Sequence, residues 1–182
     1  MPQRSMDETL AALGTVLDEF DQVARHAHTT YKGYSPDILI ELDSRAQAAC
    51  TYAHMLAEID RRVPRLPNVR PMEIRGLKLW LFENANAVVR LKKMDEDGRS
   101  RNYPTKQAKD FDAGENLPGL PMPPVRLTAG YLLDPTGTVF VRTQIARPVG
   151  RKSTMWCAAI IPADGRKPCE RAWMDVTRQG RL

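Results

Sequence analysis

A narrow apolar stripe with helical spacing runs through the N-terminal region. It predicts one amphipathic helix over residues 5–28, which Ser5 and Glu8 would begin with an S-x-x-E capping box. The stripe consists of Met6, Leu10, Leu13, Leu17, Phe20 and Ala24. A second helix is predicted over residues 35–62, because serine and proline stand at its start and further prolines follow it. Together the two helices predict an αα-hairpin.

The stripe is too narrow for a short hairpin to cover by itself. It can be buried against the rest of the chain, or against a second copy in a four-helix bundle. The sequence leaves these alternatives open. In the dimer hypothesis the interface consists of Leu10, Leu13, Leu17 and Phe20.

After the helices, the pattern changes to the short alternating runs that are typical of strands. The expected strands are residues 77–82, 87–94, 126–133, 138–146 and 155–161, with a short helix over 104–111. Turn sequences at Asp95–Gly98 and Asp134–Gly137 favour hairpins. For the C-terminal tail, a short helix around 169–176 and a poorly ordered segment are the two alternatives.

This order predicts an α+β fold, in which an N-terminal αα-hairpin precedes a mainly antiparallel sheet with one short helix. The expected divisions are an acidic helical hairpin arm at 1–62, a proline-rich linker at 63–71 and a basic, strand-rich body at 72–182.

The helical arm and the rest of the chain also differ in net charge. Residues 1–62 hold 6 basic and 10 acidic side chains, a net charge of −4, whereas residues 63–182 hold 21 and 12, a net charge of +9, which together give the +5 of the whole chain. Such asymmetry favours a surface that meets an anionic partner. The three cysteines have no metal-type spacing, and no signal peptide or membrane-length apolar run is present. The sequence therefore predicts a cytoplasmic protein without membrane contact.

The motifs of the common enzyme classes are absent, so the sequence favours a protein that is not an enzyme and needs no cofactor or metal. A metal-dependent nuclease stays open as one alternative. Candidate residues for its site are Glu83, Lys92 and Asp134, and a hairpin could bring Glu83 and Lys92 together.

Basic and hydrogen-bonding side chains are interleaved between residues 90 and 109, as in many nucleic-acid contacts. The predicted contact residues are Arg90, Lys92, Lys93, Arg99, Arg101, Asn102, Tyr103, Lys106 and Lys109. The same charges would also suit a solvated strand edge, where lysine prevents pairing between sheets.

The leading hypothesis is a non-enzymatic, homo-oligomeric protein that binds DNA or RNA, such as a regulator in a mobile-element, toxin–antitoxin or phage-defence system. The alternative from another class is a protein–protein interaction module that docks a partner through the helical hairpin.

Overall fold

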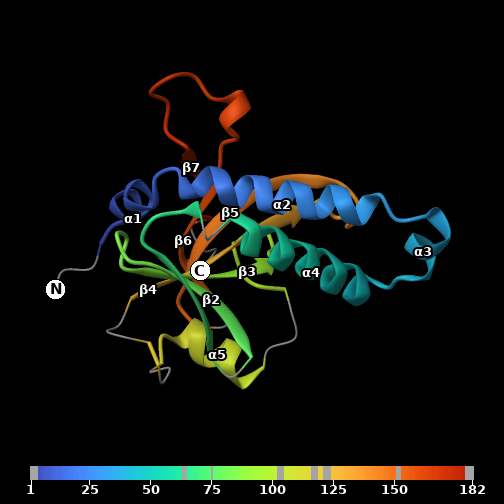
Figure 1. Cartoon of the computed structure of the whole chain (residues 1–182), viewed down its shortest axis with the longest axis horizontal. Helices are drawn as coiled ribbons and strands as arrows, with labels where there is room; N and C mark the ends of the chain where they lie inside the picture. The colour runs from blue at the N-terminus through green and yellow to red at the C-terminus, as the bar shows by residue number, and fades with distance from the viewer. Residues whose placement is uncertain are drawn as a thin grey trace.

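The sheet lies between a layer of three helices and a single short helix on its opposite face (Figure 1). The computed structural model describes residues 4–62, 65–74, 76–101, 105–115, 119–120, 124–150 and 153–178. The helices are α1 (Met6–Leu13), α2 (Val16–Lys32), α3 (Pro36–Glu41), α4 (Ser44–Arg62) and α5 (Lys106–Ala113). The strands are β1 (Val69–Ile74), β2 (Leu77–Phe82), β3 (Ala87–Lys93), β4 (Val125–Leu133), β5 (Phe140–Pro148), β6 (Thr154–Ile160) and β7 (Trp173–Asp175).

The seven strands follow one another across the sheet in chain order. Neighbours are antiparallel except β3 and β4, which run parallel. The connection between these two passes through α5 on the opposite face, and such a crossover returns the chain in its original direction. The predicted α+β class and mainly antiparallel sheet are confirmed.

Each long predicted helix is divided in two. The first breaks at Gly14, whose φ of 54° and ψ of −126° lie outside the helical region. The second breaks after α3, where Leu42 is extended and the side chain of Asp43 accepts a 2.7 Å hydrogen bond from the Ala46 amide. Asp43 thereby begins α4 as a cap, in competition with a continuous helix. The predicted capping box of Ser5 and Glu8 is present.

Two strands were not expected. The strand β1 begins at Val69, inside the predicted linker, and carries Pro71, which an edge strand tolerates. The strand β7 occupies residues 173–175, where a short helix was one of the two alternatives, because pairing with β6 outweighs the weak local preference. Both are edge strands, so each depends on the neighbour that it pairs with.

The apolar stripe of the first two helices faces the sheet of its own chain. Leu10, Leu13, Leu17 and Phe20 are between 0 and 4% exposed and belong to one core with residues of β2 to β6. The Phe20 ring meets Phe82 edge-on, with centroids 5.6 Å apart. The assignment of these four residues to a dimer interface is therefore wrong, because the sheet already excludes water from them. Helical arm and basic body share this core.

The opposite face of the sheet holds two smaller apolar clusters. One forms where Phe111 of α5 packs against Leu79 and Val88. In the other, the turn at Asp95–Gly98 folds onto Ala146 and Cys157, and a Cβ at Gly98 would lie 2.7 Å from the Ala146 Cβ. This contact requires glycine at position 98, which also has a positive φ of 77°.

The segment between β6 and β7 reaches back to the N-terminal helices. Arg166 forms a two-fold ion pair with Asp18 of α2, and the Trp173 indole donates to Asp7 of α1 at 3.0 Å. Across the described ranges, no helix combines the length and apolar character needed to cross a bilayer.

Candidate functional site

Strand β3 presents two chemically different sides. Val89 and Leu91 face α2 and α4 and are buried in the large core. Because side chains alternate along a strand, Arg90 and Lys92 project toward the face that α5 covers.

Arg90 is a buried anchor. It is 1% exposed, and its guanidinium donates to Asp112 of α5 at 2.5 Å and to the Thr128 hydroxyl of β4 at 3.0 Å. The guanidinium also lies over the Phe111 ring, 4.6 Å from its centroid. The prediction that Arg90 contacts nucleic acid is therefore wrong, since these partners enclose it.

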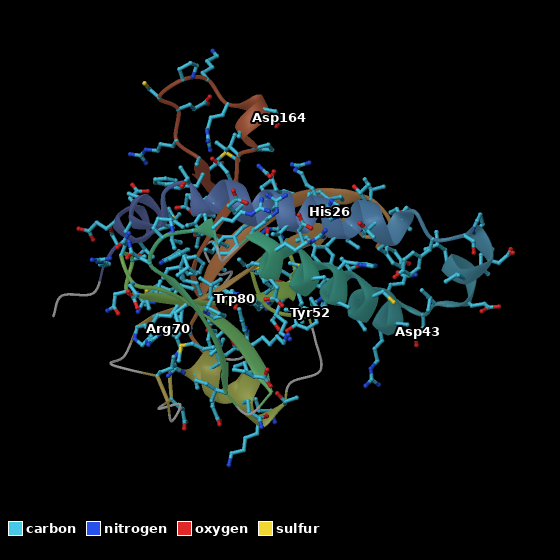
Figure 2. The ribbon with its side chains drawn as sticks, in the orientation of Figure 1. His26, Asp43, Tyr52, Arg70, Trp80 and Asp164 are labelled. Carbon is cyan, nitrogen blue, oxygen red and sulfur yellow. The ribbon has the colours of Figure 1, made fainter. Side chains whose placement is uncertain are left out.

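Lys92 lies where the sheet opens. The pairing of β2 with β3 covers Trp80–Phe82 and Ala87–Val89, while β3 continues along β4 alone as far as Lys93. Tyr52 of α4 stands beside this unpaired stretch, on the side of the helix that faces the sheet (Figure 2). The Lys92 ammonium nitrogen lies 4.7 Å from the Tyr52 ring centroid.

Burial, together with the neighbouring Arg90 charge, lowers the pKa of Lys92 to about 8, while Asp112 opposes the change. Within the described part of the chain, the Lys92 ammonium makes neither a hydrogen bond nor an ion pair. Burial raises the pKa of Asp112, although the contact with Arg90 opposes this. The single carboxylate is paired with Arg90, so the cluster holds positive charge in excess.

Burial also raises the pKa of the Tyr52 phenol, so this group is neutral near pH 7. The phenol adds no charge that could balance Lys92. Glu73 of β1 lies within electrostatic range of Tyr52 and also acts to raise its pKa.

Gly130 fixes the backbone of Lys92. The two residues are partners in the parallel register of β3 and β4, and a Cβ at position 130 would lie 1.6 Å from the Lys92 carbonyl oxygen. No other residue type permits this approach without a shift of the backbone. A glycine within a strand pattern is a sequence signal for such a contact, whereas no local signal marks Tyr52 or Asp112 as neighbours of Lys92.

Two further predicted contact residues meet at the end of β3. The hairpin that follows is closed by the Met94–Ser100 bridge and by a 3.1 Å hydrogen bond from the Arg101 amide to the Lys93 carbonyl. Burial and the nearby Arg101 charge lower the pKa of Lys93. Arg101 is exposed, so the two cations reinforce one another at the surface.

Arg99 has a structural partner in the same hairpin. It forms ion pairs with Asp95 at 3.0 Å and with Asp97 at 2.5 Å. Asp95 also accepts hydrogen bonds from the amides of Asp97 and Arg99, which confirms the predicted turn. The charge of Arg99 is balanced by these carboxylates within the turn, so Arg99 is not proposed as a nucleic-acid contact.

Four predicted contact residues remain, two on α5 and two outside the described residues. Lys106 and Lys109 are exposed on α5. Lys109 precedes Asp112 by three positions, so the two side chains share one side of the helix. Asn102 and Tyr103 lie outside the described residues.

For the nuclease alternative, the pair that a hairpin could bring together is Glu83 and Lys92. Glu83 stands in the turn between β2 and β3, whereas Lys92 is five residues beyond the first residue of β3. At about 3.4 Å per residue this separates them by roughly 17 Å along the strand. Among the described residues, no group of three or more histidine, cysteine, aspartate or glutamate side chains has the arrangement of a metal site.

No protein-family model, curated protein or solved structure matches this chain at a significant level.

Proposed function

We propose that the protein binds nucleic acid through a basic surface formed by the end of β3, the following hairpin and α5. The basic surface consists of Lys92, Arg101, Lys106 and Lys109, whereas Lys93 projects to the other side of β3 and adds its charge near Arg101. The observation that carries the proposal is the partly buried charge of Lys92, which makes no ion pair within the described residues, although Asp112 acts on it electrostatically. Withdrawing an ammonium from water is costly, and a ligand phosphate would offset that cost through charge-assisted hydrogen bonds.

Charge and position give further support. The +9 net charge of residues 63–182 attracts polyanions over a wider range than any single contact. The exposed members of the basic surface make no described ion pair. They are available to phosphates, in contrast to Arg90 and Arg99.

Fluorescence anisotropy with single- and double-stranded DNA and RNA tests this proposal. The variant Arg101→Ala/Lys106→Ala/Lys109→Ala should bind more weakly. Its plot of log affinity against log salt concentration should be flatter by about 0.9 for each duplex phosphate that the variant no longer neutralises, or by about 0.7 for each phosphate of a single strand.

The matched control is Lys32→Ala/Arg45→Ala/Lys167→Ala, which removes the same charge from exposed positions outside the basic surface. It should retain most of the affinity and salt dependence. Equal weakening in both triple variants would show a nonspecific charge effect, and absence of binding to all four polymers would refute the proposal.

A second candidate function is partner docking through α3. This helix lies at the far end of the helical hairpin (Figure 1), where Ile40 is 83% and Ile38 is 47% exposed. Exposed isoleucines beside Asp37 and Glu41 suit a partner, or a second copy, with an apolar and basic surface. The expected self-association would then use α3 in place of the Leu10 stripe. Sedimentation velocity of Ile38→Ser/Ile40→Ser tests this, because the variant should lose any association while it keeps nucleic-acid binding.

A further inference from the structure

We propose that Lys92, flanked by Tyr52 and backed by Arg90, binds the terminal phosphate of a nucleic-acid strand, which is a phosphomonoester. This inference rests on the proposed function and adds a preference for one kind of strand end. It assigns to Lys92 a role that differs from that of the exposed lysines of the basic surface.

The geometry holds the ammonium in place. The Tyr52 ring lies beside it from α4, Arg90 and Asp112 lie on its α5 side, and the close approach of Gly130 fixes its backbone. The strand β2 does not pair with β3 at this level, so no backbone hydrogen bonds close that edge of β3. A preorganised cation loses little freedom on binding.

The surroundings of Lys92 favour the end of a nucleic-acid strand over an internal phosphate of that strand. Tyr52 of α4 and the Arg90–Asp112 pair both lie beside the ammonium, so a phosphate with one attached nucleotide meets fewer neighbouring groups than a phosphate with two. An internal phosphodiester carries a nucleotide on each side, whereas a terminal phosphate carries only one. A phosphomonoester also bears a charge of about −1.5 to −2 near pH 7, and its attraction to a partly buried ammonium exceeds that of a singly charged diester.

The donors match this ligand. A lysine ammonium has three hydrogens to donate, and within the described ranges those of Lys92 are unused. The charged and titratable groups around it are Tyr52 from α4, Arg90 from β3, Asp112 from α5 and, next to Tyr52, Glu73 from β1. Asp112 is held by Arg90 and Tyr52 is neutral near pH 7, so a ligand supplies the missing negative charge.

Binding should depend on pH, since only the protonated amine attracts phosphate. The free protein loses this charge as the pH rises past the Lys92 pKa of about 8. Above that pH, the preference for a phosphorylated end should fall by up to tenfold per pH unit, as expected for one linked proton. Arginine stays charged throughout this range.

The test uses oligonucleotides of one sequence that carry a 5′-phosphate, a 3′-phosphate or hydroxyls at both ends. At pH 7 the wild-type protein should bind one phosphorylated form about tenfold more tightly than the hydroxyl form. Lys92→Met should abolish this preference and Lys92→Arg should remove its fall above pH 8. The control Lys167→Met, at an exposed position outside the basic surface, should keep both the preference and its pH dependence.

The outcomes separate the two proposals. Equal binding of all three oligonucleotides by the wild-type protein would overturn the inference while the proposed function stands. If no oligonucleotide binds, both the inference and the proposed function are overturned. Should Lys92→Met fail to fold, the pH profiles of the wild-type protein and Lys167→Met decide: a preference that does not fall above pH 8 would overturn the inference.

Discussion

The two faces of the sheet differ in the side chains that the same strands direct toward them. Toward α1, α2 and α4, the strands present a continuous apolar core that includes Val89 and Leu91. Toward α5, the alternate residues of the same strand are Arg90 and Lys92. Arg90 is in a buried ion pair, whereas Lys92 lies beside the Tyr52 ring and makes no ion pair within the described residues. The first face stabilises the fold, whereas the second contains a charge that folding does not require.

This difference separates two kinds of polar residue on the second face. Arg90 has an ion-pair partner and an aromatic ring against it, so its charge is compensated within the chain. Lys92 has lost part of its hydration and lies beside the Tyr52 ring, but within the described residues it has no ion-pair partner. Charges of this kind are concentrated at functional sites, where stability is given up for binding or chemistry.

The largest effect is expected on the apolar face. Trp80 is 1% exposed, and replacing it with alanine should lower the free energy of unfolding by about 3–5 kcal/mol. Its indole N–H has no described hydrogen-bond partner, so Trp80→Phe should cost clearly less. Urea unfolding followed by circular dichroism measures both. A Trp80→Ala variant as stable as the wild-type protein would contradict the description of this core.

The next effect concerns the ion pair on the second face. Arg90→Met should destabilise the protein by about 3 kcal/mol, because it leaves the partly buried Asp112 carboxylate without its partner. Adding Asp112→Asn should restore part of the stability, since the remaining charge is removed. A double-mutant cycle of unfolding free energies measures this coupling. Additive effects would show that the two residues act independently.

Replacing Lys92 should raise the free energy of unfolding, whereas replacing Arg90 should lower it. The lowering of its pKa from 10.5 to about 8 sets an upper limit of about 3 kcal/mol on the destabilisation at neutral pH. Because the side chain keeps some contact with water, Lys92→Met should stabilise the protein by about 1–2 kcal/mol at pH 7. Lower stability in this variant would show that the ammonium has a partner within the fold.

The pH dependence checks the same point. Between pH 8 and 10.5 the unfolded chain keeps the Lys92 proton that the folded protein has released. The stability of the wild-type protein should therefore rise with pH across this range relative to Lys92→Met. Lys109→Met should follow the wild-type protein. Urea unfolding at pH 7, 8, 9 and 10 measures the difference.

The smallest effect is expected in the apolar cluster beneath the Asp95–Gly98 turn. Burial raises the pKa of the Cys157 thiol to about 12, so it should resist alkylation at pH 8 in the folded protein. Cys169 is exposed and should react readily. Mass spectrometry after brief iodoacetamide treatment distinguishes them. Rapid labelling of Cys157 would show that this part of the second face opens to water.

Local features of the fold were predictable from the sequence. The capping box at Ser5 and the turns at Asp95–Gly98 and Asp134–Gly137 depend on residues within a few positions of each other. Five of the seven strands were expected from alternation alone, and the basic character of residues 90–109 was visible in the composition. Interactions over such short separations are specified by neighbouring residues in almost any tertiary context.

Tertiary structure decided the rest. The apolar spacing of the Leu10 stripe is the same whether the stripe packs on its own sheet or on a second copy, so it could not show which occurs. Arg90 and Lys92 carry the same charge, so the sequence could not show that Arg90 is enclosed while Lys92 is not. The edge strands, the parallel β3–β4 pair and the meeting of Tyr52, Lys92 and Asp112 all join residues far apart in the chain. The sequence by itself determined the local elements and the sign of the charge, and long-range packing determined which charges lose their water and which find a partner.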